Sequence, residues 1–283
     1  MTFSIVAYDP SSDPPEWGVA VASKFLSVGA AVPWASAGVG AVATQALANL
    51  AYGPDGLRML ASGRSATEVV NALTGPDELR EQRQVGVVDA AGEPATFTGS
   101  ECLDWAGGIT GKHFACQGNI LTGPEVVDEM ASAFEAAKGE LGVRLLAALK
   151  AGDDAGGDRR GRQGAALYIV REGGGYGGGI DKAVDLRVDD HEAATDELLR
   201  LWDLHRLYFP RPEELDFIVI DDVVATELRG HLMELGYDAG EGAGYDSSLK
   251  DALWAYVGTE NLEERWTDEA KIERGILEYL RKH

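Results

Sequence analysis

The chain has 283 residues, of which 45% are hydrophobic and 25% charged, and its length predicts a main domain with a smaller appended one. Its formal net charge of -22, without any block rich in Lys or Arg, opposes binding to a phosphate backbone and excludes nucleic acid as an expected partner. The N-terminus has neither the basic region nor the apolar length of a signal peptide, and no long apolar run follows, so we expect a cytoplasmic protein with no membrane partner.

The first predicted elements form a β-hairpin that opens at residue 2. Two short apolar runs, Phe3 to Tyr8 and Trp17 to Ser23, flank a turn rich in proline, serine and aspartate. Residues 28–44 are almost wholly small and apolar, a pattern typical of strands buried on both faces. We therefore expect this part of the chain to lie deep in the fold.

Helix pairs and strands then alternate along the chain. Apolar residues at helical spacing predict helices over 47–62 and from a cap at Ser65 to Leu73, and a second pair over 126–138 and 141–150. Further strands are predicted over 83–89, 95–98, 114–119, 165–171 and 183–188. This order predicts an α+β fold, with two antiparallel sheets packed face to face and a helical layer outside each.

The C-terminal part of the chain reads as a separate unit. An amphipathic helix over 192–208 has a broad apolar surface that can pack on the main domain or on a second copy, so we expect a homodimer. The Phe-Pro-Arg-Pro sequence that follows is typical of a stiff linker. We place the boundary near Pro212, which gives domains over 1–212 and 213–283, the second one small, acidic and helical. Its helices are predicted over 223–235, 247–257 and 268–280.

Thr2 is the candidate nucleophile. A small residue after Met1 permits removal of the initiator methionine, which leaves a hydroxyl and a free α-amine on the same residue. A free α-amine has a pKa of about 8 and can act as the general base for its own hydroxyl. Many chains begin with Met-Thr without using it, but Thr2 directly enters a predicted strand that would hold it at a sheet end. Lys24, just after the second strand, can lower the pKa of that amine or be an ordinary solvated lysine.

The chain contains four separated segments that belong together: GVAVASKFLSVGAAVPWASAGVGAVATQ, RQVGVVDAAGEPATFTG, QGNILTG and AGGDRRGRQGAAL. Together they resemble the family named domain of unknown function 1028 (DUF1028), which is placed among the N-terminal nucleophile (Ntn) hydrolases, and the resemblance covers roughly residues 2–210. It implies a four-layer αββα Ntn-hydrolase-like sandwich, in which Thr2 cleaves an amide bond and neither a metal nor an organic cofactor is required. It also implies that Lys24, Asn119 and Asp158 lie near Thr2 at the sheet ends.

The residues around this implied site suggest individual roles. Asp158 can accept a hydrogen bond from the terminal ammonium, and the Gly118-Asn119 turn can supply an amide donor to an oxyanion. The resemblance also implies a serine where this chain has Gly164, and if that serine relays the proton in the family, the relay is missing here.

Substrate binding is assigned to a basic loop and to two polar residues after the small apolar run. Arg159 and Arg160, with Arg162 beside them, can hold a substrate carboxylate, or they can form ion pairs that pin the loop, and Gln163 belongs to the same motif. Gln45 and Asn49 can line the pocket or cap the start of the following helix. These five assignments are Gln45, Asn49, Arg159, Arg160 and Gln163.

Two functions from different classes remain open at this point. The first is an amide hydrolase acting on a small amide or peptide with Thr2 as nucleophile, and the second is a non-catalytic ligand-binding or scaffold protein that keeps the fold and Met1. A thiol enzyme using Cys102 or Cys116 is weaker, because His113 alone lies close in sequence to either. In the tail, VVATELRGHLMELGY and YDSSLKDALWAYVG resemble peptidoglycan-binding domains, which implies a small helical bundle.

Overall fold

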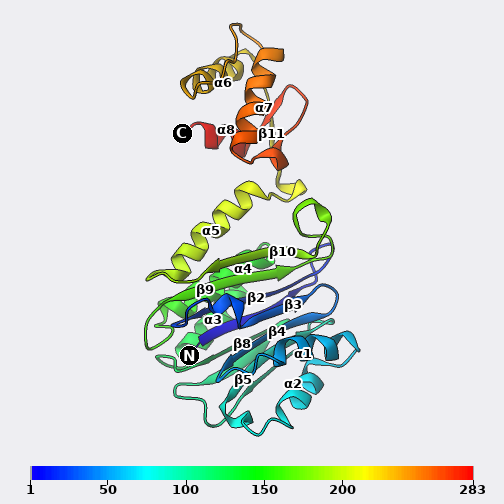
Figure 1. Ribbon diagram of the computed structural model, residues 1–283, viewed down its shortest axis with the longest axis vertical. Helices are drawn as coiled ribbons and strands as arrows, with labels where there is room; N and C mark the ends of the chain where they lie inside the picture. The colour runs from blue at the N-terminus through cyan, green and yellow to red at the C-terminus, as the bar shows by residue number, and fades with distance from the viewer. Residues whose placement is uncertain (1, 283) are drawn as a thin grey trace. The chain divides into compact units, whose positions relative to one another are not determined.

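The computed structural model describes residues 2–282, which form two compact units divided between Leu201 and Trp202 (Figure 1). The first unit contains two antiparallel sheets. The six-stranded sheet has the order β10-β9-β2-β1-β8-β7, with bounds β1 Thr2–Asp9, β2 Glu16–Ser23, β7 Gly107–Gly111, β8 Phe114–Asn119, β9 Gly164–Val170 and β10 Lys182–Val188. The four-stranded sheet has the order β3-β4-β5-β6, with bounds β3 Pro33–Ser36, β4 Gly40–Ala46, β5 Arg83–Asp89 and β6 Pro94–Thr98.

Four helices cover the outer faces of the two sheets (Figure 1). Helices α1 Tyr52–Ala61 and α2 Ala66–Thr74 pack on the four-stranded sheet, where Leu60 and Val69 join Val42 in one apolar cluster. Helices α3 Glu125–Ala136 and α4 Leu141–Asp154 pack on the six-stranded sheet, where the rings of Phe114 and Phe134 are 4.8 Å apart. The α+β class and the four-layer αββα sandwich are therefore confirmed.

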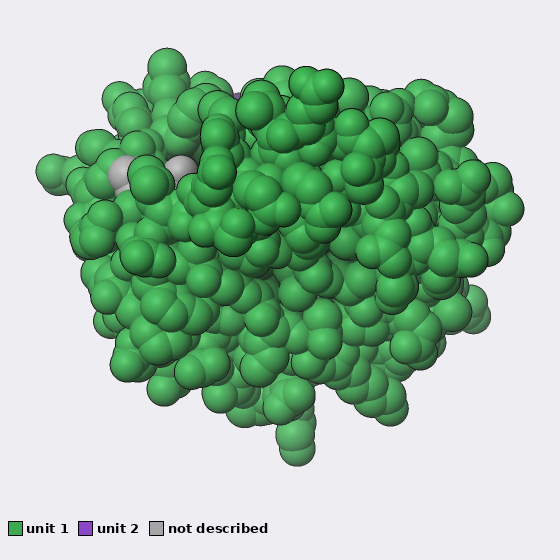
Figure 2. Space-filling model, turned by 90° about the horizontal axis from the view of Figure 1, so that it is seen from below, with its two compact units in different colours: residues 1–201 green, residues 202–283 purple. Residues whose placement is uncertain are grey.

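The two sheets meet through an apolar cluster made of side chains from both. Val6, Val19 and Val21 of the six-stranded sheet pack with Ala43 and Val88 of the four-stranded sheet, and all five are fully buried. Successive residues of a strand point to opposite faces of the sheet. Each strand therefore contacts the other sheet with one set of side chains and the helices with the alternate set. We call this set the inter-sheet apolar cluster. Figure 2 shows one face of the first unit in a space-filling view.

Several predicted elements differ from the observed ones in their details. Helix α1 begins at Tyr52 and not at residue 47, because the chain at Leu47 and Leu50 is an exposed loop. Strand β7 was not predicted, since its sequence, GGITG, is rich in glycine and mostly exposed. The capping role of Ser65 is confirmed, because its hydroxyl accepts from the backbone N–H of Glu68 in a capping box.

The second unit has its own core. Its helices are α6 Asp222–Glu234, α7 Ser247–Thr259 and α8 Arg274–Leu280, and it also holds a two-stranded sheet of β11 Phe217–Val219 and β12 Lys271–Glu273. The helix predicted over 268–280 was wrong in its first half, because residues 271–273 pair as β12. Apolar residues of the three helices, including Leu228, Leu253 and Leu277, form the core.

Helix α5 Ala194–Tyr208 contains the division between the units, on the N-terminal side of Pro212. Short 3-10 helices complete the described elements, namely η1 Val28–Ala30, η2 Arg80–Gln82, η3 Tyr176–Gly178, η4 Pro212–Glu214 and η5 Glu263–Arg265. Among residues 2–282, no helix combines the length and apolar character needed to cross a membrane.

Candidate functional site

One edge of the six-stranded sheet gathers the ends of four strands. Strands β1 and β9 begin there, at Thr2 and Gly164, and the antiparallel strands β2 and β8 end there, at Ser23 and Asn119. In the register, Thr2 lies opposite Asn119, and Ser23 lies opposite Gly164. The side chain of Thr2 is buried, and its Oγ1 lies 3.0 Å from the Oγ of Ser23. The sheet therefore holds the predicted nucleophile in a fixed position, beside a hydroxyl that sequence reasoning missed.

Asp158 ties the glycine-rich loop to this edge. Its backbone forms a β-bridge with Leu121, and its buried carboxylate accepts hydrogen bonds from the backbone N–H of Lys24 at 2.8 Å and of Arg160 at 2.9 Å. The Arg160 guanidinium pairs with the same carboxylate at 3.1 Å. The structure thus brings Lys24 and Asp158 together, but through the main chain of Lys24. The Lys24 ammonium donates to the backbone carbonyl of Arg162 at 3.2 Å, so it is directed at the loop.

The other polar residues of the loop have different environments. Arg162 donates from Nε to both carboxylate oxygens of Asp153, at 2.7 and 2.9 Å, and this hydrogen bond raises the pKa of the arginine. Gln163 donates to Asp190 at 3.1 Å. Arg159 is exposed, and among residues 2–282 its guanidinium forms no ion pair. Arg160 and Arg162 therefore pin the loop, whereas Arg159 keeps its charge available at the surface.

Polar side chains from both sheets meet in the layer between the sheets, next to Thr2. We call them the inter-sheet amide cluster, and each is at most 2% exposed: Ser4, Gln45, Gln84, Gln117 and Asn119. The hydroxyl of Ser4 donates to Gln45 Oε1 at 2.7 Å and accepts from Gln117 Nε2 at 2.7 Å. Gln45 Nε2 donates to Gln84 Oε1 at 2.8 Å and approaches the carbonyl of Thr2 at 3.4 Å. The cluster therefore supports the main chain of Thr2.

Gln84 is the centre of this cluster. Its Oε1 accepts from Gln45 and also from Asn119 Nδ2, at 2.9 Å, while its Nε2 donates to the carbonyls of Gly107 and Gly118 at 3.1 and 2.7 Å. The predicted residues Gln45 and Asn119 thus meet at one side chain that the sequence did not single out. Burial without a partner is costly for an amide, and the cluster avoids that cost by pairing its members with each other.

Asn49 lies in a different cluster. Its side chain donates to Asp77 at 3.2 Å, and the same carboxylate accepts from Tyr52 at 2.8 Å and from Arg83 at 3.0 Å. The hydrogen bond from Arg83, with those from Tyr52 and Asn49, holds the pKa of Asp77 well below its usual range. Burial and the neighbouring Asp77 raise the pKa of Tyr52. Asn49 therefore stabilises the start of α1, a role that fits its alternative interpretation.

Gly164 lies where a side chain would meet the backbone of two neighbouring segments. A Cβ built at this position would lie 2.8 Å from the carbonyl oxygen of Phe25 and 3.2 Å from that of Val188. The segment after β2 and the segment after β10 are also held together here, because the Ser27 N–H donates to the Asp189 carbonyl at 3.0 Å. The backbone occupies the space of a side chain at position 164, and Ser23, opposite Gly164 in the register, places a hydroxyl near Thr2.

The two thiols offer poor nucleophiles. Cys116 is fully buried, and burial strongly raises the pKa of its thiol. Burial also raises the pKa of Cys102. Since the thiolate is the reactive form, neither environment favours thiol chemistry. Within residues 2–282, no three His, Cys, Asp or Glu side chains are grouped closely enough to hold a metal ion.

Two family models and a solved structure match parts of this chain. Residues 2–198 match the sequence model described as "Family of unknown function (DUF1028)", and residues 208–280 match that of a "Putative peptidoglycan binding domain". The chain is also similar to a crystal structure of protein SPO2555 from Silicibacter pomeroyi, described as a DUF1028 protein. The two are 32% identical with a TM-score of 0.66, over 72% of this chain and 86% of that chain. No curated protein shows significant similarity. Both resemblances inferred from the sequence are confirmed.

Proposed function

The chain belongs to the DUF1028 family, and from this premise we propose that it is an amide hydrolase of the Ntn class. In this proposal it cleaves a small amide or peptide bond, with Thr2 as the nucleophile once Met1 is removed. The observation that carries it is the position of Thr2, whose buried hydroxyl lies 3.0 Å from Ser23 at an edge where four strands end. Met1 itself lies outside the described residues.

The proposed chemistry needs only groups of the chain and water. The α-amine of Thr2 takes the hydroxyl proton as Oγ1 attacks the substrate carbonyl carbon, and an oxyanion forms. The C–N bond then breaks, and the leaving amine carries the proton away from the α-ammonium group. Water, deprotonated by the same amine, hydrolyses the acyl ester and restores Thr2. Ser23 is a positioning residue in this scheme, because its hydroxyl sets the orientation of Thr2 Oγ1.

The surrounding residues support the geometry in two ways. The loop anchored by Asp158 on the Lys24 N–H fixes the end of β2, which carries Ser23. Gln45 and Asn119, joined by Gln84, fix the backbone on the other side of Thr2. A nucleophile held by locked neighbours needs little reorganisation during the reaction, which favours catalysis. In this proposal the free charge of Arg159 contributes to attraction of an anionic substrate.

The test combines a mass with an activity measurement. We expect the intact mass of the purified protein to lack Met1, and we expect amine release from at least one member of a panel of N-acyl amino acids and dipeptides. Thr2→Ala should lower turnover by at least about 10³-fold, because it removes the nucleophile, whereas Thr2→Ser should retain part of it. Retained Met1 with no turnover would instead favour the non-catalytic ligand-binding or scaffold protein.

A second variant tests the role given to Ser23. Ser23→Ala should lower kcat by about 10-fold and leave KM nearly unchanged, because it removes a hydrogen bond that orients the nucleophile and not one that binds substrate. Ser100→Ala, an exposed serine of the same unit, is the matched control and should keep the activity of the parent protein. A rise in KM alone for Ser23→Ala would contradict the positioning role.

A further inference from the structure

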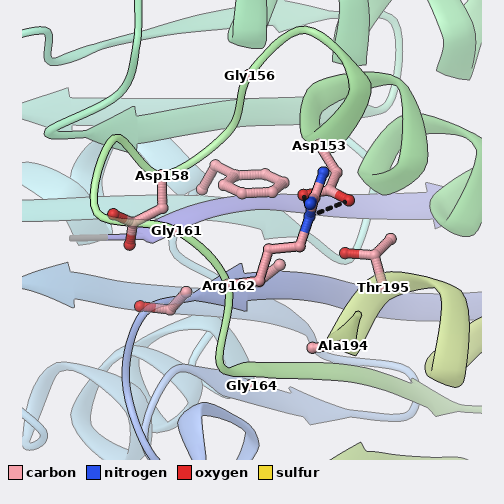
Figure 3. Close-up of a pocket in the computed structure, with 11 residues that line it drawn as sticks. Asp153, Gly156, Asp158, Gly161, Arg162, Gly164, Ala194 and Thr195 are labelled. Carbon is pink, nitrogen blue, oxygen red and sulfur yellow. Dashed lines mark hydrogen bonds and ion pairs between the residues drawn. The ribbon is translucent and has the colours of Figure 1, made fainter. Parts of the chain in front are cut away.

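A small pocket lies on the helix side of the edge that carries Thr2 (Figure 3). Its volume is about 110 Å³, which is room for a few non-hydrogen atoms. The end of β2, the C-terminal end of α4, the glycine-rich loop and the start of α5 form its walls, with Ser23, Asp153, Asp158, Arg162 and Thr195 as the polar lining residues. Ser23 connects this pocket with Thr2, because its hydroxyl contacts Thr2 Oγ1.

The hydroxyl of Thr195 has no hydrogen-bond partner among residues 2–282. The residue is 1% exposed, and its Oγ1 makes no hydrogen bond within residues 2–282. Figure 3 shows this side chain pointing toward Arg162 across the pocket. Buried hydroxyl groups are normally paired, so an unpaired one directed into a cavity indicates a group that binds there. Thr195 also belongs to the first turn of α5, whose N–H groups lack intrahelical acceptors and favour a negative charge.

Around the pocket, the arginine retains unused N–H donors, whereas the carboxylates already accept hydrogen bonds from the protein. The side-chain hydrogen bonds of Arg162 within residues 2–282 use only Nε, so both Nη groups keep N–H donors. Asp153 is paired with that Nε, and Asp158 accepts from the Lys24 N–H and from Arg160. Asp196, the acidic residue next to Thr195, lies 3.5 Å from the Lys150 ammonium. A ligand that offers acceptors therefore fits this pocket better than one that offers donors.

We propose that the pocket binds a carboxylate of the substrate through the Nη groups of Arg162 and the hydroxyl of Thr195. This step rests on the proposed function, because it takes Thr2 as the site of amide cleavage. Ser23 lines the pocket and its hydroxyl also contacts Thr2 Oγ1, so a substrate that reaches both the pocket and Thr2 carries its carboxylate close to its scissile amide. An N-acylated α-amino acid has this arrangement, with one carbon between its amide nitrogen and its carboxylate. The substrate class is therefore N-acyl-α-amino acids.

Binding can be tested without cleavage in the full chain carrying Thr2→Ala. We expect calorimetry to show binding of N-acetylglycine, whose carboxylate fills the pocket, and at least about 10-fold weaker binding of the neutral N-acetylglycinamide, which loses the charged hydrogen bonds. Arg162→Gln should weaken the binding of N-acetylglycine by about 10-fold or more. The matched control is Arg64→Gln, an exposed arginine between α1 and α2, which should leave the affinity unchanged. Equal affinity for the two probes, or an equal loss in both variants, would overturn the assignment.

Thr195→Val separates a ligand-binding role from a structural one. This variant keeps the shape of the side chain and removes only the unpaired hydroxyl, so the melting temperature without probe should stay the same or rise, while N-acetylglycine should bind about 10-fold more weakly. A lower melting temperature with unchanged affinity would assign Thr195 a structural role and overturn the proposal. Binding of N-acetylglycine without any amide hydrolysis by the parent protein would support the pocket and contradict the proposed function. Hydrolysis of neutral amides without binding of either probe would support the proposed function and contradict the assignment of the pocket.

Discussion

The layer between the two sheets consists of two regions that differ in chemistry although the same strands build them. On β1, Ser4 belongs to the inter-sheet amide cluster and Val6 to the inter-sheet apolar cluster. On β5, Gln84 belongs to the amide cluster and Val88 to the apolar cluster. Both regions are fully buried. The step from one to the other takes only two to four residues along a strand, and the amide cluster is the region that adjoins Thr2.

The difference teaches how one buried layer combines stability with a fixed geometry. Apolar burial is roughly proportional to area and has little directional preference, so the apolar cluster stabilises the sandwich without fixing individual atoms. Hydrogen bonds between amides have preferred directions, and in a buried site an unpaired member is costly. The amide cluster therefore fixes the backbone beside the proposed nucleophile, at the risk of a larger loss if one member is changed.

The largest effect is expected from a change at the centre of the amide cluster. Gln84→Leu should lower the free energy of unfolding by about 3–4 kcal/mol, because it removes a buried acceptor from the amides of Gln45 and Asn119 and a donor from two backbone carbonyls. Val19→Ala in the apolar cluster should cost only about 2 kcal/mol, from lost apolar burial and a small cavity. Urea unfolding of both variants measures the two values. A smaller loss for Gln84→Leu than for Val19→Ala would break the comparison.

A smaller loss of stability is expected from a substitution at Gly86, which leaves space for a side chain of the amide cluster. Gly86 faces Gln117, and a Cβ at this position would lie 2.1 Å from Gln117 Oε1. Gly86→Ala should therefore displace that amide from Ser4 and cost about 2 kcal/mol of the free energy of unfolding. Gly56→Ala is the matched control in α1, where the nearest side-chain atom, on Val42, is 3.2 Å away and alanine favours the helix. Thermal and urea unfolding should place this control within about 1 kcal/mol of the parent protein.

The smallest of the three effects on stability is expected at Asp77, and it depends on pH. Hydrogen bonds from Arg83, Tyr52 and Asn49 lower the pKa of Asp77, so the folded state binds the proton less readily than the unfolded state. This stabilisation is fully present above the usual pKa of about 4 and is lost as the pH falls through the lowered value. Asp77→Asn should therefore be less stable than the parent protein at pH 7, with a difference that shrinks below pH 4.

Urea unfolding at several pH values between 2 and 7 measures this dependence. The amide cluster consists of serine, glutamine and asparagine side chains, which do not ionise in this range. The loss caused by Gln84→Leu should consequently be the same at pH 4 and at pH 7. A constant difference between Asp77→Asn and the parent protein down to pH 2 would show that the Asp77 carboxylate does not carry the acid sensitivity.

The fold could be predicted because its patterns are local. The hairpin of β1 and β2 and the capping box at Ser65 depend on residues close in sequence, and the alternation of strands with helix pairs fixes the layers. Strand β7 could not be predicted, because an exposed, glycine-rich edge strand lacks the apolar alternation of a buried one. The start of α1 could not be predicted either, since Leu47 and Leu50 have helical spacing but are exposed.

The candidate site could be predicted only in part, because its contacts join distant segments. Thr2 and Asn119 lie opposite each other, and Lys24 meets Asp158, as the family resemblance implies. The roles of Ser23 and Gln84 were missed, since a single polar residue in a strand usually indicates a solvent-facing position. The signal that could have found Gln84 is its period: Gln84, Gly86 and Val88 share one face of β5, and apolar Val88 marks that face as buried.

The glutamine at the centre of the amide cluster also limits how this protein can change over evolutionary time. Each amide in the cluster is oriented by the next, so reversing one side chain would place oxygen against oxygen and nitrogen against nitrogen at its neighbours. A single substitution therefore meets several mismatched partners at once, whereas a simultaneous replacement of the whole set by apolar residues would meet none. Each single step from one arrangement to the other should therefore cost stability, and we expect descendants of this chain to keep or lose the cluster as one unit.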